Sequence, residues 1–167
     1  LYRAIQNLNI LTEQATAANQ FGYAGIAQIM KAVAFSYMVD VWGDIPFTEA
    51  STSAQVQFPK FDKGQDIYPQ LFKLLDEGIA NLAKTSSLNP TTDDLVYSGN
   101  LVNWRRFAKT FKLKLYNQVR LVQNVSTEVN ALIAEGDLMQ PSGGFSLRYG
   151  TSSAPDNRNP IFREDYN

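Results

Sequence analysis

The longest apolar stretch of the chain covers residues 24–42 and predicts a buried helix. Apolar side chains recur there at the spacing of one helical face, at Ile26, Ile29, Met30, Val33 and Val41. Others cover most of the remaining helix surface, namely Ala27, Ala34, Phe35, Met38 and Trp42. A helix that is apolar nearly all round is expected to have neighbours on several sides. Gly43 suits the left-handed residue that ends a helix, and Pro46 keeps the helix from resuming.

Amphipathic stripes predict four further helices, over residues 1–18, 66–84, 101–123 and 127–135. In the helix over 66–84, Asp66 is expected to cap the first turn. Pro69 is tolerated in that turn because the amides there have no partner within the helix. Ser126 is expected to cap the last helix, and Gly136 to close it. The short break between the first helix and the buried one predicts that these two helices pack antiparallel.

Long polar or irregular segments separate these helices, over residues 47–65, 85–100 and 137–167. Phe58 and Phe61 are expected to pin the first segment to the core. In the second segment, the adjacent Asp93 and Asp94 are interpreted as a solvated acidic pair. In the third, the alternation of residues 145–149 predicts one short strand, and the rest is expected to be loop.

The whole pattern predicts an all-α fold in which successive helices pair, in the manner of an α-solenoid, with long irregular loops inserted between them. We divide the chain into a helical core over residues 1–136 and a loop-rich segment over residues 137–167. Leu1 is not an initiator methionine, and the final residues carry no signal that would end the fold. We therefore expect an internal piece of a longer polypeptide, whose C-terminal part lies beyond residue 167.

Composition excludes several kinds of chemistry. The formal net charge of −1 argues against a general nucleic-acid binder. The absence of cysteine and histidine excludes thiolate metal sites, histidine ligands and Ser-His-Asp or Cys-His catalysis by this chain. No cofactor is predicted. A membrane-spanning helix is not expected either, because Lys31 and Asp40 interrupt the apolar stretch.

The charged and tryptophan residues of the predicted helices are assigned as follows: the charges to ion pairs, the tryptophans to the core. The helix over residues 101–123 carries positive side chains with no acid among them, at Arg105, Arg106, Lys109, Lys112, Lys114 and Arg120. Because acidic residues elsewhere more than balance these, we expect ion pairs with other elements rather than a nucleic-acid surface. Trp42, on the buried helix, and Trp104, on the apolar face of the helix over residues 101–123, are interpreted as core residues.

A glycoside hydrolase is an enzyme class that this composition leaves open, because paired carboxylates need no histidine. Asp40 and Asp44 are the acidic residues that stand in strongly apolar surroundings. Both are more readily interpreted as structural hydrogen-bond acceptors. The chain is therefore not expected to be an enzyme.

Two motifs resemble those of a known family. The buried helix runs into Trp42-Gly43-Asp44-Ile45-Pro46-Phe47-Thr48-Glu49-Ala50, and a second motif covers residues 103–115, with Asn103-Trp104-Arg105-Arg106-Phe107-Ala108-Lys109 at its start. Together and in this order they resemble the SusD/RagB family of bacterial outer-membrane nutrient-binding lipoproteins. Lys109 stands where the family usually has Asn, and Phe111 where it usually has Leu. The resemblance covers roughly residues 1–125.

The resemblance implies both a fold and a function. SusD-like proteins contain TPR-like helical pairs with ligand-binding loops between them. They sit on the outer surface of the outer membrane of Bacteroidota, held by a lipid anchor that this chain does not include. There they form a lid on a SusC-like TonB-dependent transporter and capture oligosaccharides, or in some members peptides, without catalysis. We expect this chain to belong to such a glycan-binding component.

Binding residues are predicted from the chemistry that the family uses, in which aromatic rings pack on sugar faces and amide, carboxylate or guanidinium groups bind the hydroxyls. Side chains of these types lie in polar, turn-rich loops at Tyr97, Tyr149, Asn157 and Arg158. The alternative function is an α-helical scaffold that binds a protein or peptide on the concave face of its helical pairs. Exposed aromatics beside polar loops favour sugar binding, a large apolar groove favours a peptide, and two facing carboxylates favour hydrolysis.

Overall fold

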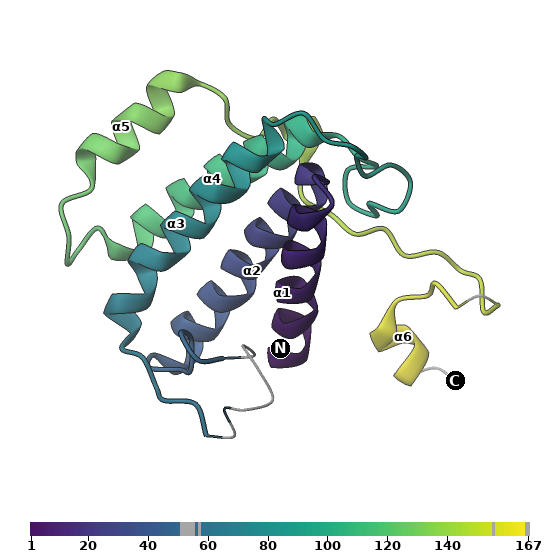
Figure 1. Cartoon of the computed structure of the whole chain (residues 1–167), viewed down its shortest axis with the longest axis horizontal. Coiled ribbons are helices and arrows are strands. Elements are labelled where there is room, and N and C mark those ends of the chain that lie inside the picture. Colours follow the sequence, from purple (N-terminus) through teal and green to yellow (C-terminus); the bar gives the residue numbers. More distant parts are fainter. Residues whose placement is uncertain (51–55, 57, 155, 166–167) are drawn as a thin grey trace.

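The computed structural model of the protein describes residues 1–50, 56, 58–154 and 156–165. Within them the chain forms helices in the order α1 (Tyr2–Ala17), α2 (Phe21–Trp42), α3 (Gly64–Leu82), α4 (Leu101–Val119), α5 (Ser126–Glu135), the 3-10 helix η1 (Pro141–Gly143) and α6 (Pro160–Asp165) (Figure 1). The described part of the chain contains no strand, only isolated bridges at Ile45–Asp62 and Ser153–Asp156. The predicted all-α fold is confirmed.

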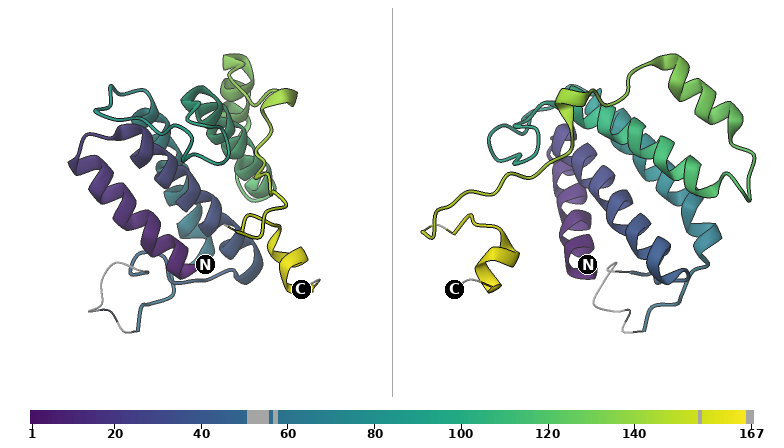
Figure 2. Two further views of the ribbon diagram at one scale, coloured as in Figure 1. Left: turned by 90° about the vertical axis from the view of Figure 1, so that its right-hand side faces the viewer. Right: turned by 180° about the vertical axis from the view of Figure 1, so that it is seen from behind.

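Helices α1 to α4 form the body of the molecule, in which each helix packs on the next (Figures 1 and 2). The most extensive contacts join α2 to α3, followed by those between α1 and α2. Helix α5 extends away from the body on one side, and the tail with α6 extends away on the other (Figure 2). This consecutive pairing matches the TPR-like arrangement that the sequence predicted.

Helix α2 is buried because neighbours cover it on several sides, as its apolar surface required. Its fully buried side chains include Ile29, Phe35 and Met38. By length and composition α2 could cross a membrane, but 56% of its most apolar window is buried inside this fold, as in the core helix of a soluble protein. Gly43 ends the helix as expected, with a positive φ of +71° that favours glycine, but its ψ of −108° lies outside the left-handed helical conformation.

Helices α2 and α3 approach closely where a glycine of each helix faces the other. A Cβ atom built on Gly25 would lie 2.8 Å from the carbonyl oxygen of Gly78 and 3.0 Å from the side chain of Leu82. A Cβ atom on Gly78 would lie 2.7 Å from the side chain of Ile29. These distances are shorter than ordinary carbon contacts, so the crossing depends on the absence of side chains at both positions.

The same interface contains a short polar network. Gln28 donates through Nε2 to Glu77 (3.1 Å) and accepts through Oε1 from Nδ2 of Asn81 (2.7 Å). Asn81 in turn accepts from Nζ of Lys84 at 2.7 Å. Gln28 and Asn81 are both buried, so these bonds replace the water that they lose on folding.

Two predicted helix caps are wrong. Helix α3 begins at Gly64, two residues before Asp66, so Pro69 lies beyond the first turn. Ser126 is already the first residue of α5. Its amide and hydroxyl both donate to Oδ1 of Asn124, at 3.2 and 2.7 Å. The side chain of Asn124 thus serves the start of this helix, whereas Gly136 closes it in the left-handed conformation as expected.

Several large apolar side chains are exposed near the C-terminal ends of α2 and α4 and in the connection to α3, namely Val41, Trp42, Phe58, Phe61, Leu121 and Val122. We call this set the exposed apolar end. Trp42 is 60% exposed, and Phe58 and Phe61 are 87% and 71% exposed, so their expected burial in the core is wrong. Trp42 is the last residue of its helix and follows Val41, which is 70% exposed. Trp104, in contrast, is 2% exposed and is confirmed as a core residue.

The segment after α5 also departs from the prediction. Residues 145–149 form no strand, because among the described residues no neighbouring segment pairs with their backbone. Residues 160–165, expected to be loop, form α6. Asn159 accepts through Oδ1 from the amide of Ile161 at 2.9 Å, which supports the start of this short helix.

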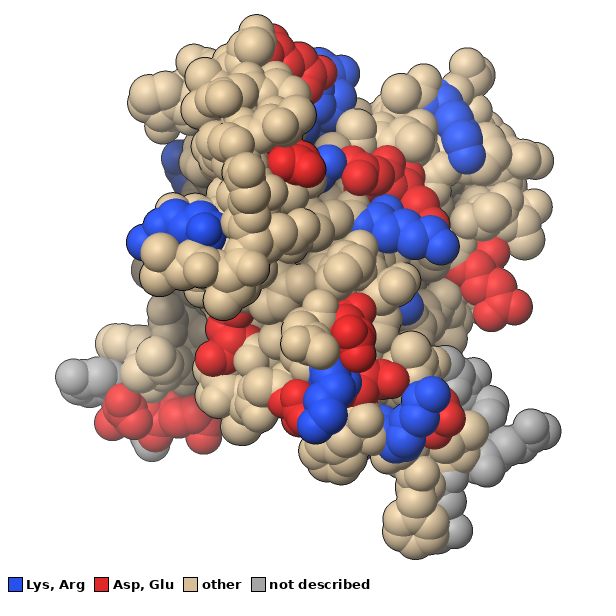
Figure 3. Space-filling view, turned by 90° about the vertical axis from the view of Figure 1, so that its left-hand side faces the viewer, with Lys and Arg blue, Asp and Glu red and all other residues tan. Residues whose placement is uncertain are grey.

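The expected ion pairs of α4 are confirmed for most of its positive residues. Lys112 pairs with Asp76 of α3, and Lys114 with Asp40 of α2 at 3.2 Å. Figure 3 shows the resulting interspersion of positive and negative side chains on the face where α5 lies. Arg120 instead donates to the carbonyl oxygen of Asn117 at 2.5 Å.

Candidate functional site

The loop between α3 and α4 is organised by the carboxylate of Asp94. Its Oδ1 accepts hydrogen bonds from the backbone amides of Val96 (3.0 Å) and Tyr97 (3.2 Å). Its Oδ2 accepts from the amide of Gly99 (3.0 Å) and from the indole Nε1 of Trp104 (2.7 Å). Because Trp104 belongs to α4, these bonds tie the loop to that helix and fix the position of Tyr97.

This arrangement corrects the interpretation of Asp93 and Asp94 as a solvated acidic pair. Asp93 is exposed and accepts from the hydroxyl of Tyr23 at 2.8 Å, whereas Asp94 is half-buried. Burial alone would raise the pKa of Asp94, but the bonds from Trp104 and the loop amides outweigh it and lower the pKa.

Replacing Asp94 with asparagine is expected to lower the free energy of unfolding by about 1–2 kcal/mol, because an amide cannot accept from all four donors. Urea unfolding followed by circular dichroism measures this loss. Asp93→Asn is the control, and its effect should be smaller because Asp93 is exposed. An equal loss in both variants would contradict the organising role of Asp94.

Tyr97 joins the loop to the segment that follows α5. Its hydroxyl donates to the carbonyl oxygen of Gly143 at 3.1 Å, and its ring meets Trp104 edge-on, with the ring centroids 5.2 Å apart. Phe145 completes the cluster by stacking on Phe107 at 4.5 Å between centroids. The ring of Tyr97 is therefore half-buried rather than freely exposed, and its position is fixed on two sides.

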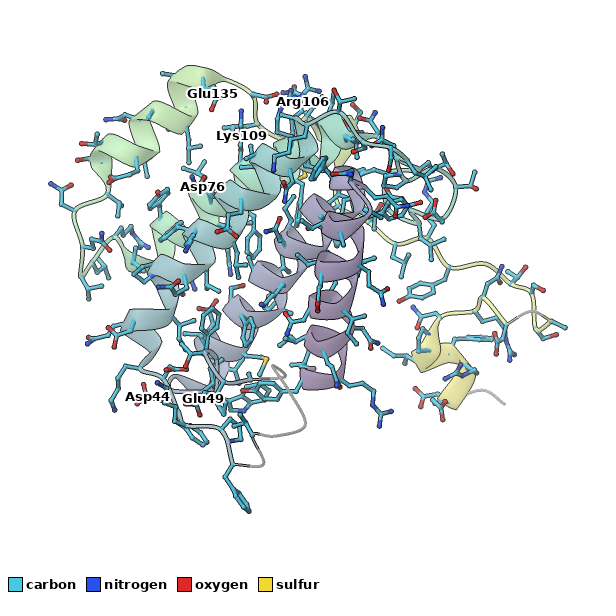
Figure 4. All side chains as sticks on the ribbon, viewed as in Figure 1. Asp44, Glu49, Asp76, Arg106, Lys109 and Glu135 are labelled. Carbon is cyan, nitrogen blue, oxygen red and sulfur yellow. The ribbon has the colours of Figure 1, made fainter. Side chains whose placement is uncertain are left out.

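Asp137 holds the start of the same segment against α4. Its carboxylate accepts from Nε of Arg105 (2.7 Å), Nε of Arg106 (3.1 Å) and Nζ of Lys109 (3.0 Å). Lys109 also pairs with Glu135 at the end of α5, and Figure 4 shows Arg106, Lys109 and Glu135 close together. The bond from Arg105, followed by those from Lys109 and Arg106, lowers the pKa of Asp137 far below its usual range. We call this group the Asp137 cluster.

Between the loop and this segment lies an open cleft of about 380 Å³, which we call the polar cleft. It is lined by Leu95, Val96, Tyr97, Ser98, Asn103, Ser142, Gly143, Gly144, Ser146 and Arg148. Hydroxyl, amide and guanidinium groups thus face the cleft beside one aromatic ring. Such a surface can bind a polyhydroxylated ligand through several hydrogen bonds while the ring contacts an apolar face.

Most of the lining residues were not among the predicted site residues, although the sequence held a signal for two of them. Residues 145–149 alternate between apolar and polar, and side chains of an extended chain alternate between its two sides. Phe145 accordingly packs on the aromatic cluster, while Ser146 and Arg148 line the polar cleft. The alternation was interpreted as a strand, but it marks a two-sided extended segment.

The structure brings together only some of the predicted site residues. Tyr97 lines the polar cleft, whereas Tyr149, Asn157 and Arg158 belong to the tail beyond it. Asn157 closes a turn there, because its Oδ1 accepts from the amide of Ser152 at 3.0 Å. Arg158 is engaged with the carboxylate of Asp156 at 3.0 Å, and Tyr149 remains 48% exposed.

Comparison with known proteins identifies the family of the chain. A family model named SusD-like, described as "Starch-binding associating with outer membrane", matches residues 1–167. The chain belongs to the SusD-like family. The suspected resemblance is thereby confirmed. No curated protein matches the sequence significantly.

Solved structures agree on the fold of this SusD-like chain. A SusD/RagB family protein of Bacteroides thetaiotaomicron is 23% identical, with a TM-score of 0.82 over 98% of this chain and 35% of that one. A SusD homolog of Bacteroides uniformis is 25% identical, with a TM-score of 0.80 over 95% of this chain and 33% of that one. A chitin-binding protein is 26% identical, with a TM-score of 0.68 over 84% of this chain and 31% of that one. The chain spans about a third of the length of these structures.

In this SusD-like chain the motif at residues 42–50 forms a network that supports the fold. Asp44 accepts from Nζ of Lys63 (2.6 Å) and from the amide of Gly64 (3.0 Å), at the start of α3. Ile45 is bridged to Asp62, and Glu49 accepts from the amide of Lys60 at 3.0 Å. The motif therefore joins the end of α2 to the start of α3, and Asp44 and Glu49 lie at the opposite end of the helical body from Arg106 and Lys109 (Figure 4).

Proposed function

We propose that this chain is the helical part of a non-catalytic glycan-binding protein of the bacterial cell surface, and that the polar cleft contributes to its ligand site. The observation that carries the proposal is the convergence of Tyr97, Asn103 and Arg148 with several serine hydroxyls on one open cleft. Sugar hydroxyls both donate and accept, and this lining offers both functions. Membership of a family described as starch-binding supports the same ligand class.

The positioning of the lining residues supports binding over a merely irregular surface. Asp94 fixes the loop that carries Tyr97, and the Asp137 cluster and Phe145 fix the opposite wall. A site whose walls are held in place before the ligand arrives loses less conformational entropy on binding. Tyr149, Asn157 and Arg158, on the adjacent tail, stay proposed contacts for a ligand that extends beyond the cleft.

The chemistry of the described residues supports capture rather than hydrolysis. Asp40 accepts from the hydroxyl of Tyr68, from Nζ of Lys114 (3.2 Å) and from Nε2 of Gln118 (3.3 Å). Asp44 is engaged at the start of α3. Both candidate carboxylates thus have structural partners. The cleft itself is lined by no carboxylate among the described residues, whereas a hydrolase requires two.

The test is retention of the full-length protein in native gels that contain soluble starch or glycol chitin. Arg148→Ala, whose side chain is exposed beside the cleft, and Tyr97→Ala are expected to weaken binding at least about tenfold, or about 1.4 kcal/mol. Tyr97→Phe should keep most of the affinity, because it retains the ring. Circular dichroism checks that each variant is folded.

Arg163→Ala is the matched control, and Tyr149→Ala tests the proposed contact on the tail. Loss of retention in Arg148→Ala but not in Arg163→Ala would support the cleft. Unchanged retention in both Arg148→Ala and Asn103→Ala would contradict it. Loss in Tyr149→Ala alone would move the ligand site to the tail.

A second candidate function rests on the exposed apolar end. Phe58 and Phe61, in the connection between α2 and α3, are 87% and 71% exposed, and exposed large apolar side chains that gather in one segment mark protein contacts. We infer that this end contacts protein, either another part of the longer polypeptide or the SusC-like transporter that the family resemblance implies. A surface location on the outer membrane, through a lipid anchor outside this chain, belongs to the same proposal. If the chain instead serves as a peptide-binding scaffold, this end is the expected contact.

A further inference from the structure

A second groove, distinct from the polar cleft, lies between the start of α3, the end of α4 and the start of α5. Its volume is about 590 Å³, within the range of small-molecule sites. Aromatic and polar residues share its lining, namely Gln65, Tyr68, Pro69, Phe72, Tyr116, Val119, Val122, Gln123 and Glu128. We call it the aromatic groove.

The rings of the aromatic groove are held in defined positions. Phe72 and Tyr116 stack nearly parallel, with centroids 4.2 Å apart and an angle of 16° between the rings. The hydroxyl of Tyr68 donates to Asp40, which Lys114 and Gln118 also engage. All three rings are only half-buried, so each contributes apolar surface to the groove without filling it.

Polar side chains surround these rings. Gln65 and Gln123 are exposed amides that can both donate and accept, and Glu128 supplies a carboxylate acceptor. Burial raises the pKa of the Tyr116 hydroxyl, and the negative charges of the nearby Glu128 and Asp76 raise it further. That hydroxyl therefore remains a neutral donor at physiological pH.

The charge of the lining selects among possible ligands. No lysine or arginine is among the described residues that line the groove, and its one charged residue is acidic. Positive and negative side chains are interspersed over this face rather than gathered into a basic field (Figure 3). An anionic sugar or a phosphate would meet Glu128 without a compensating cation, whereas the hydroxyls of a neutral sugar would find acceptors and amides.

We propose that the aromatic groove is a second carbohydrate site, which takes a neutral oligosaccharide with one sugar packed on the Tyr68, Phe72 and Tyr116 rings and its hydroxyls on Gln65, Gln123 and Glu128. The inference shares its ligand class with the proposed function, but it rests on different residues. Two separate sites on one chain would raise the affinity for a long glycan by making the second contact intramolecular.

The test is oxidative footprinting of the full-length protein by hydroxyl radicals, read by mass spectrometry, with maltoheptaose and chitohexaose as probes and oligogalacturonate as the anionic comparison. Saturating maltoheptaose or chitohexaose is expected to slow the oxidation of Tyr116 at least about twofold, while oligogalacturonate does not. The double variant Gln123→Ala/Glu128→Ala should reduce this protection. Both substituted residues are exposed, so the fold should tolerate their replacement. The matched pair Gln6→Ala/Glu164→Ala should leave it unchanged.

The outcomes separate this inference from the proposed function. Protection of Tyr116 that persists in Arg148→Ala supports the groove whether or not the polar cleft binds. Binding that depends on Arg148 without any protection of Tyr116 overturns the groove and leaves the proposed function standing. If Tyr116 resists oxidation even without sugar, the groove is covered in the full-length protein and the inference is wrong.

Discussion

Replacing Gly25 with valine is expected to lower the free energy of unfolding by about 3 kcal/mol, at the upper end of what overpacking usually costs. A Cβ atom at this position already lies 2.8 Å from the carbonyl oxygen of Gly78 and 3.0 Å from Leu82. The two methyl groups of valine need still more room, and the carbonyl oxygen belongs to a rigid helix. The change would therefore separate α2 from α3 at their most extensive interface.

Chemical unfolding monitored by circular dichroism measures this effect, and Gly144→Val is the control. A Cβ atom on Gly144 meets nothing within 4 Å, and its φ of −59° accommodates any side chain. Gly25→Ala makes the test sharper. In an uncrowded helix position, replacing glycine with alanine would raise the free energy of unfolding by up to about 1 kcal/mol, whereas here the crowded Cβ atom is expected to lower it. If Gly25→Ala raised stability, the close approach of the two helices would be wrong.

Asp137→Asn is expected to cost about 2–3 kcal/mol, because it leaves three positive side chains without their shared carboxylate. Lys109 is the most affected, since only 9% of this residue is exposed. Glu135 still partners Lys109, which keeps the loss below that of a fully orphaned buried charge. The measurement is again the free energy of unfolding, with Asp76→Asn as the matched control. Asp76 serves a single lysine, its side chain is 59% exposed, and its loss should cost less than about 1 kcal/mol.

The pH dependence of this difference follows from the lowered pKa of Asp137. A carboxyl group whose pKa is lower in the folded state stabilises the fold fully above its unfolded pKa of about 3.9, and that contribution is lost as the pH falls towards the folded pKa. The stability gap between the wild type and Asp137→Asn should therefore be constant from about pH 7 to pH 5 and shrink below about pH 4. A gap that widened on acidification would contradict the cluster.

The two tryptophans show how far the sequence could predict the fold. Long apolar runs were enough to predict the helices, because helical periodicity is a local property. Trp42 is the last residue of α2 and Trp104 lies in the first turn of α4, yet Trp104 is buried and Trp42 is exposed. The difference depends on which elements lie beside each helix end, and that information is not local. The starts of α3 and α5 were misplaced for the same reason, since Asp44 and Asn124 support them from outside the predicted helices.

The candidate site was predictable only in part. Tyr97 was predicted from its place in a polar loop, and it lines the polar cleft. Arg148 and Ser146 reach the same cleft only because Asp137 and Phe145 bring a segment some 40 residues downstream against α4. The partner of Asp94 was likewise an indole nitrogen on a neighbouring helix. Contacts between side chains that are distant in sequence leave no periodic pattern, so spacing alone could not identify them.

The Asp137 cluster has a consequence for how such a binding wall can change over evolution. It fastens the segment at one end through ion pairs with α4, and Phe145 fastens it near the other end through an aromatic contact. Apart from Met139, which packs against the hydrophobic core, the residues between these two attachment points are not part of that core. Their length and identity can therefore drift, or be exchanged by grafting, while the helical body keeps its sequence and stability. In a scaffold of this kind, the residues that determine the fold and those that determine ligand specificity can evolve independently.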